Sequence, residues 1–461
     1  MKQFCLGLLI WEALLISPVM PQMKMSDKEM ETLIRDALTT ARDSMEDMTP
    51  VSNKVFRDNT DPKPSPDKTV MVMAWGQFID HDFIRTPISS GQREQLNSLT
   101  SYIDASNVYG STQDQQDSLR TKYHGGLKMK GNGLPGRPTG CVIDQSPNDY
   151  CYHAGDERVN TVPSLGTTHI IFLRDHTRIA NELTNINPMW TDEIIFQETR
   201  KIISAFNQQI TYGEFLPVLL NEKLMKNYGL NNAPCHSDVY DETVNAATGN
   251  AFDVAVFRFG HTLIPHFQGL MNDDLVTIEK FKTETTFNRP FLIQKANGTN
   301  QYFMTRWMTV GPAGRMDRIF EKAILDLLFV DSNGDSFDLP SLNIQRGRDH
   351  GTPGYNDWRR WCNLPRATHF GSNAGGLVNH TPDNAMRLGN VYQDVDDIDL
   401  FAGGITETHI EGGGIGPTFA CMLGRQFKNF KIGDRFWYEQ PPQHLGGTGF
   451  TKGKYKKIRQ L

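Results

Sequence analysis

The sequence predicts a mainly α-helical protein that folds as one large domain. Apolar residues recur at helical spacing in several long stretches, alternating strand patterns are scarce, and no segment repeats another. The helical stretches cover residues 70–82, 164–183, 193–210, 251–263, 316–329 and 418–427. With 38% apolar residues among 461, the chain can bury a large core. A net charge of −6 gives no electrostatic argument for binding nucleic acid.

Residues 1–20 are predicted to be a secretory signal. Lys2 supplies a basic start, and residues 4–16 form an apolar stretch that is too short to span a bilayer. No later stretch is apolar enough for a transmembrane helix, so we expect a secreted, extracellular protein without a membrane-spanning segment. Two glycosylation triplets, at Asn297 and Asn379, agree with this location.

Residues 21–66 are predicted to form an N-terminal helix and a linker. Ser26 and Glu29 make a capping box, and apolar residues at helical spacing follow as far as Met48. This helix fits a docking segment, a pro-region or an ordinary N-terminal helix. Residues 59–67 contain three prolines, which indicates a linker that leads into the main domain at residues 67–461.

The cysteine count leaves one thiol without a partner. One of the six cysteines, Cys5, lies within the signal. The remaining five are Cys141, Cys151, Cys235, Cys362 and Cys421. In a secreted chain an odd number means a free thiol, an intermolecular disulfide or a missing partner.

The stretch at residues 70–82 brings polar side chains together on one turn of its predicted helix. Gln77 and His81 are four residues apart and share a face, and Asp80 lies close to it. A buried imidazole resists protonation, so His81 would be available as a base near neutral pH. A helix end capped by polar residues is the alternative.

Two later stretches carry candidate ligands of another kind. His261 lies among apolar residues at 257–262, where it is either a core residue or the ligand of a flat cofactor. Asn343 opens a charged stretch at 342–351, and its side-chain oxygen can accept the proton of a ligating histidine. The arginines of that stretch can hold carboxylates by paired hydrogen bonds. A solvated loop is the alternative for this stretch.

A further candidate site lies at residues 99–106, where oxygen-bearing side chains alternate with other types. Such a loop can direct side-chain and carbonyl oxygens to one centre, which is the ligand set that Ca²⁺ prefers. Asp82 could add a second carboxylate. A polar turn is the alternative. The alternating residues are Thr100, Tyr102, Asp104 and Ser106.

Taken together, these stretches resemble the animal haem peroxidase family, and they occur in the family's order. The matching segments are residues 75–82, 99–106, 154–158, 257–262, 342–351 and 434–437. The resemblance spans residues 67–461 and implies a mainly α fold, in a single large domain, around one haem.

The resemblance implies four roles on the distal side of the haem. His81 matches the histidine that takes a proton from hydrogen peroxide and returns it to the leaving oxygen. Arg158 matches the arginine that stabilises charge on the breaking O–O bond, and Gln77 would hold water or a halide beside His81. Asp80 matches the carboxylate that esterifies a haem methyl.

On the proximal side, His261 matches the iron ligand and Asn343 its hydrogen-bond partner. Arg258 and Arg346 would lie near the haem propionates or in the proximal pocket. The resemblance also implies a calcium ion, whose ligands would come from Asp82, Thr100, Tyr102, Asp104 and Ser106.

The chain departs from the family at the positions of covalent haem attachment. Thr161 stands where the family has a second ester-forming carboxylate, and Val162 lacks the sulfur that some mammalian members bond to the haem. Any covalent link to haem b would therefore run through Asp80 alone.

Three segments are also shorter than in the family. The connection at residues 83–99 is brief, a cysteine-bearing segment before residue 70 is missing, and the chain ends short of the family's C-terminal part. These differences indicate a shortened splice form or an incomplete gene model. The pairs Cys141–Cys151 and Cys362–Cys421 match family disulfide positions, which leaves Cys235 over.

The resemblance therefore implies a secreted haem peroxidase. Hydrogen peroxide would oxidise ferric haem by two electrons, and halide, thiocyanate or phenolic donors such as tyrosine would return them. The alternative class is an adhesion or extracellular-matrix protein that keeps the scaffold without efficient turnover, with contacts to the matrix or the cell surface.

Overall fold

The fold is known from a computed structural model, which describes residues 48, 50–58, 62–86, 96–143, 149–295, 298–330, 333–441 and 450. The predicted signal, nearly all of the predicted N-terminal helix and the triplet asparagine Asn297 lie outside the described residues. The described part is mainly helical, which confirms the predicted fold class. None of its helices is long and apolar enough to cross a membrane.

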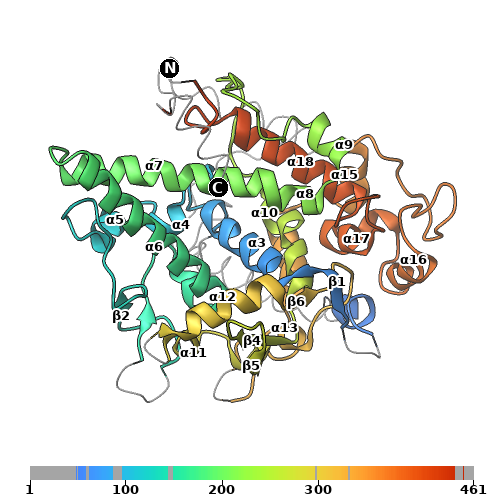
Figure 1. The fold of residues 1–461 in the computed structure, drawn as a ribbon. Helices are drawn as coiled ribbons and strands as arrows, with labels where there is room; N and C mark the ends of the chain where they lie inside the picture. Colours follow the sequence, from blue (N-terminus) through green and yellow to red (C-terminus); the bar gives the residue numbers. More distant parts are fainter. Residues whose placement is uncertain are drawn as a thin grey trace, which may run out of the picture.

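Figure 1 shows the arrangement of the helices and of three small two-stranded sheets. The α-helices are α3 (Val70–Phe83), α4 (Ser106–Tyr109), α5 (Gln113–Leu119), α6 (Pro163–Ile186), α7 (Asp192–Ile210), α8 (Leu216–Leu219), α9 (Glu222–Asn227), α10 (Asn250–Val254), α11 (Phe291–Gln294), α12 (Asn300–Val310), α13 (Lys322–Leu325), α14 (Leu339–Asp349), α15 (Tyr355–Trp361), α16 (Pro382–Gly389), α17 (Leu400–Thr406) and α18 (Pro417–Ile432). The 3₁₀-helices are η1 (Glu157–Asn160), η3 (Val256–Leu263), η4 (Thr283–Thr285) and η6 (Val395–Asp397), and η2 (Thr211–Phe215) is a π-helix.

The sheets are antiparallel pairs: β1 with β6, β2 with β3, and β4 with β5. Their strands are β1 (Pro64–Thr69), β2 (Gly136–Arg137), β3 (Cys151–Tyr152), β4 (Phe267–Met271), β5 (Thr277–Lys282) and β6 (Pro312–Gly314). The second half of the predicted linker is thus strand β1, because its backbone pairs with β6.

Helix α3 lies in the interior, where it packs against α6, α12 and η3 (Figure 1). Phe78 stacks on Phe172 of α6 with ring centroids 4.8 Å apart. The Trp75 Nε1–H group donates to the Thr211 hydroxyl at 3.3 Å. These apolar and polar contacts turn the other side of α3, with Gln77 and Asp80, away from the core.

Helices α6, α7 and α18 agree closely with the predicted stretches. The predicted helix at 251–263 is instead broken at Ala255 into α10 and the 3₁₀-helix η3. The Arg258 Nε–H group donates to the Asp253 carbonyl at 2.8 Å. An uninterrupted α-helix would direct that carbonyl to the amide of Phe257, so the Arg258 side chain competes with helix continuation.

The predicted helix at 316–329 is wrong except for the short α13. The Phe320 amide donates to the Phe56 carbonyl at 3.2 Å, and Arg318 Nη1 donates to the Val55 carbonyl at 2.8 Å. These hydrogen bonds to a distant segment replace those of a local helix. Residues 342–351, for which a loop was the alternative, lie almost entirely within α14, which Asp338 caps through the Ser341 amide at 3.0 Å.

Two disulfides connect the cysteine pairs implied by the family resemblance, Cys141–Cys151 and Cys362–Cys421. The second joins α18 to the end of α15. Cys235 is an exposed free thiol.

Candidate active site

The last turn of α3 carries a buried histidine between two carboxylates. His81 Nε2 lies 3.9 Å from Asp80 Oδ2, and His81 Nδ1 lies 3.8 Å from Asp156 Oδ1. Among the described residues, no hydrogen bond satisfies His81 Nδ1. Burial and the positive charge of Arg158 hold the pKa of His81 well below its usual value, so the imidazole is neutral and can accept a proton.

Gln77 lies one turn before His81 on the same face of α3 and is half-buried. Its amide can therefore reach the space beside the imidazole. Asp80 is 14% exposed and faces Arg158, with Nη1 and Oδ2 3.9 Å apart. Burial raises the pKa of Asp80 to about 6, although Arg258 and Arg158 favour its ionised form.

Asp156 holds Arg158 in place by three hydrogen bonds. It caps η1 by accepting the Arg158 amide at 2.9 Å, and it accepts Nε at 2.8 Å and Nη2 at 2.9 Å. Burial alone would raise the pKa of Asp156, but the charge and hydrogen bonds of Arg158 hold it well below its usual value. Arg158 Nη2 also donates to the Ile84 carbonyl at 2.9 Å, which ties it to the end of α3.

Sequence reasoning missed Asp156, although the residue lies within the matching segment 154–158. The available signal was the residue type itself, because aspartate is a preferred N-cap and Asp156 directly precedes η1. Asp156 is completely buried.

His261, on the neighbouring η3, is paired with Asn343 of α14 through one ring nitrogen. Its Nδ1 lies 3.0 Å from the Asn343 amide nitrogen, and turning that amide over would present its oxygen to Nδ1–H. Burial and the charge of Arg258 lower the pKa of His261 to about 3. No hydrogen bond from the described residues occupies Nε2. A neutral imidazole that is oriented through Nδ1 could hold haem iron through Nε2.

The two proximal arginines differ in their partners. Arg258 Nη2 donates to Asp253 Oδ1 at 2.7 Å, and Asp253 Oδ2 accepts the Thr86 hydroxyl at 3.0 Å. Asp253 was also missed from the sequence; it joins η3 to the segment that follows α3. The Arg346 side chain on α14 is accessible to solvent, but protein surrounds part of its guanidinium group. This partial burial, together with the positive charge of Arg258, lowers the pKa of Arg346. The charge of Arg258 acts on both elements: it lowers the pKa of His261 on η3 and favours the ionised form of Asp80 on α3.

The predicted calcium loop folds against Asp82, which is completely buried. Asp82 accepts the Ala105 amide at 3.0 Å, the Ser106 amide at 2.6 Å and the Ser106 hydroxyl at 2.9 Å. The Thr100 hydroxyl donates to Asp104 at 3.2 Å. Burial and the charge of Asp104 raise the pKa of Asp82 to about 8.

The buried carboxylate of Asp82 and the half-buried carboxylate of Asp104, beside hydroxyl oxygens, fit a hard cation such as Ca²⁺. The Tyr102 side chain is exposed, so only its carbonyl could join this set. Within the described part of the chain, no group of three or more His, Cys, Asp or Glu side chains is placed to hold a metal. A calcium site here therefore depends on neutral oxygens as well as on Asp82 and Asp104.

Thr161 follows η1, and its hydroxyl donates to the Arg158 carbonyl at 2.7 Å. Val162 is the N-cap of α6 and is buried. Neither residue offers a carboxylate or a thioether.

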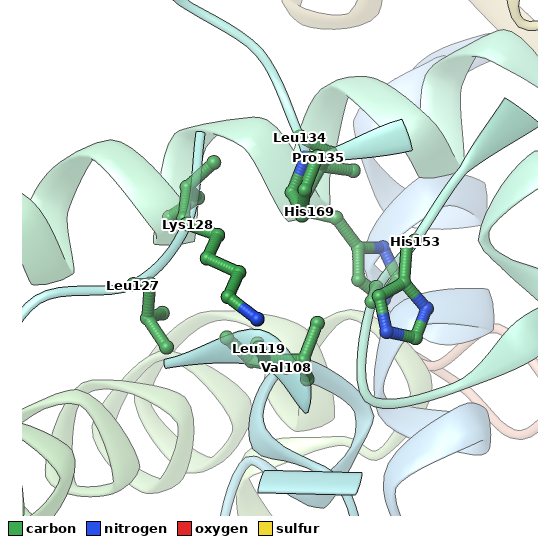
Figure 2. Close-up of a pocket in the computed structure, with 10 residues that line it drawn as sticks. Val108, Leu119, Leu127, Lys128, Leu134, Pro135, His153 and His169 are labelled. Carbon is green, nitrogen blue, oxygen red and sulfur yellow. The ribbon is translucent and has the colours of Figure 1, made fainter. Parts of the chain in front are cut away.

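A separate pocket is lined by residues of α4, α5 and α6 and of the segments at 127–135 and 153–154 (Figure 2). His169 and His153 line it together with mostly apolar side chains, and the His169 ring stands edge-on to Phe78 with centroids 4.9 Å apart. Neither His81 nor His261 lines this pocket, so it is distinct from the candidate active site.

Helix α3 contacts η3, so His81 and His261 lie on adjacent elements of a mainly helical fold. The family model described as animal haem peroxidase matches residues 25–92 and 88–461. The chain belongs to the animal haem peroxidase family.

Individual relatives agree with this assignment. The chain is 38% identical over 389 residues to a peroxidase-like protein of Margaritifera margaritifera, which covers 80% of this chain and 48% of that protein. It is 37% identical over 363 residues to a human peroxidasin homologue, with 76% and 24% covered. The chain thus spans about half of the first relative and a quarter of the second.

A solved structure shares both fold and extent with this chain. Peroxidase A from Dictyostelium discoideum superposes with a TM-score of 0.75 at 27% sequence identity. The match covers 90% of this chain and 88% of that one.

Proposed function

We propose that this protein is a secreted haem peroxidase that uses hydrogen peroxide to oxidise a small electron donor. The observation that carries the proposal is the pair of neutral histidines on adjacent elements: His81 beside Arg158, and His261 oriented by Asn343. Family membership supports haem b as the cofactor between them.

His261 would hold the haem iron through Nε2, with Asn343 fixing the ring. Arg258 and Arg346, both cationic, would face the haem carboxylates. When bound, the haem supplies an iron centre that can be oxidised by peroxide and then reduced by donors. Asp80 is the carboxylate that could form a single ester with the haem, because Thr161 and Val162 cannot form the other known links.

His81 would move the proton on the distal side. Its neutral imidazole would accept the proton of one peroxide oxygen and deliver it to the other, which would leave as water while the bound haem supplies the two electrons for cleavage of the O–O bond. Arg158, held by Asp156, stabilises the negative charge that develops on the leaving oxygen. Gln77 would orient water or a halide beside His81.

The proposed donors are halide, thiocyanate or phenols. With at most one ester, the haem would be less distorted than in doubly linked relatives, so we expect weaker oxidation of chloride than of iodide, thiocyanate or phenols. We further propose that Ca²⁺ binds at Asp82 and the loop at 100–106, where it would fix the helix end that carries His81.

The full chain, purified with added haem, tests this function. We expect a strong Soret band that shifts on mixing with peroxide, and His81→Ala should slow that shift about 100- to 10,000-fold. His369→Ala, in an exposed loop, is the matched control and should react at the wild-type rate. An unchanged rate in His81→Ala would refute the role of His81, and a chain that takes up no haem would favour the non-enzymatic scaffold.

A further inference from the structure

One face of α7 contacts the loop of the proposed calcium site. Arg200, Ser204 and Gln208 recur every four residues and therefore share that face. The Ser204 hydroxyl donates to the Asp104 carbonyl at 2.8 Å, and Gln208 Nε2 donates to the Ile103 carbonyl at 3.0 Å. Arg200 Nη2 lies 3.5 Å from Asp104 Oδ2. Two of these side chains hold the loop backbone, whereas Arg200 meets a carboxylate.

The C-terminal segment 434–440 supports this face. Gln208 Nε2 also donates to Asp434 Oδ2 at 3.2 Å, and its Oε1 accepts the Tyr438 amide at 2.9 Å. Gln208 is buried, so its amide has both ends fixed. The matching segment 434–437 thus orients the residue that positions Ile103.

Arg200 itself is held in a defined position. Its guanidinium carbon lies 5.6 Å from the centre of the Tyr109 ring, and its side chain is 22% exposed. Asp104 and the buried Asp82 both accept the Ser106 amide, so their carboxylates lie close together and repel each other when ionised. Without a bound cation, the positive charge of Arg200 beside Asp104 offsets this repulsion.

We propose that Arg200 is a built-in counter-cation of the calcium loop, which stabilises the calcium-free protein and limits the affinity for Ca²⁺. This inference rests on the proposed calcium site. A bound Ca²⁺ would lie close to Asp104, and two positive groups that share one carboxylate repel each other. Arg200 therefore has opposite effects on the two states, whereas a residue that merely shapes the loop would favour both.

Calcium titration of the full chain, after chelation, tests this inference by calorimetry. Arg200→Gln should lower the Kd for Ca²⁺ roughly tenfold. The charge around such sites changes their Kd by orders of magnitude. The same variant should unfold at a lower temperature in chelator than the wild type. Arg200→Lys keeps the charge and should retain an affinity close to wild type.

Lys201→Gln is the matched control, because it removes the same charge from the next residue of α7. Lys201 pairs with Glu198 at 2.7 Å instead of with the loop, so its calcium affinity should equal that of the wild type. Equal or weaker calcium binding by Arg200→Gln, with binding intact in the wild type, would overturn the inference alone. No calcium binding by the wild type would refute the calcium site itself, and the inference with it.

Discussion

The hydrogen bonds of Asp156 make Asp156→Asn a sharp test of the distal site. Asparagine can still accept the Arg158 amide and Nε through its oxygen, but its NH₂ group would face the donor Nη2, which Asp156 now accepts at 2.9 Å. A hydrogen bond to a charged group contributes about 1.5–3 kcal/mol. Because Arg158 is 27% exposed, solvent screens part of this, and we expect a loss of about 2 kcal/mol in the free energy of unfolding.

The stability that Asp156→Asn loses should be largest near neutral pH and smaller in acid. The pKa of Asp156 is lower in the folded protein than in the unfolded chain, so its stabilisation is complete above the unfolded pKa, about 3.9. The stabilisation is lost as the pH falls through the lower, folded pKa. The stability difference between wild type and Asp156→Asn should therefore be constant between about pH 7 and pH 5 and shrink below about pH 4.

Urea denaturation at matched pH values, followed by tryptophan fluorescence, measures this difference. Stopped-flow mixing with peroxide should show a reaction about tenfold or more slower, because the Arg158 guanidinium is no longer held by two oxygens. The control is Glu157→Gln, which removes the neighbouring charge from a surface pair with Arg85 and should change stability by less than about 0.5 kcal/mol. If Asp156→Asn matches this control in both stability at pH 7 and peroxide rate, the bonds to Arg158 do not position it.

Three further predictions concern the cofactors. His261→Ala should lose stable haem binding, seen as a fall in the ratio of Soret to protein absorbance; full haem content would contradict ligation by His261. Chelation or Asp104→Ala should lower both the unfolding temperature and the peroxide rate, and indifference of both measurements would rule out a working calcium site. Acid–butanone extraction of peroxide-treated protein, with mass spectrometry of haem peptides, should find at most one link, at Asp80; a haem peptide linked at Thr161 would disprove this.

The sequence by itself determined where the central helix α3 lies and which of its residues share a face. The apolar run from residue 70 forms α3, and the four-residue spacing places Gln77 and His81 on one face, as helical periodicity requires. The motif order indicated the family, and the family model and relatives confirm it. These features are local in the chain, so periodicity and motif spacing suffice to find them.

Only the tertiary structure decided which groups hold the catalytic candidates. Asp156 and Asp253 are ordinary aspartates in the sequence, and their role follows from the arginines that they orient. Arg258 bonds back to the Asp253 carbonyl and so breaks a stretch whose apolar spacing is fully helical. Propensity alone cannot anticipate such a contact, because a helix boundary is a balance that one side-chain hydrogen bond can shift.

In the proposed calcium loop, too, the sequence shows the candidate ligands, whereas only the tertiary structure shows which distant residues hold them. Its oxygen-bearing pattern is visible at residues 100–106, but Arg200 and Gln208 reach it from about 100 residues further along the chain. Their four-residue spacing is equally compatible with any exposed helix face. The packing of α7 against this loop decides their role, because burial converts polar side chains that water would otherwise satisfy into partners of the loop backbone and of Asp104.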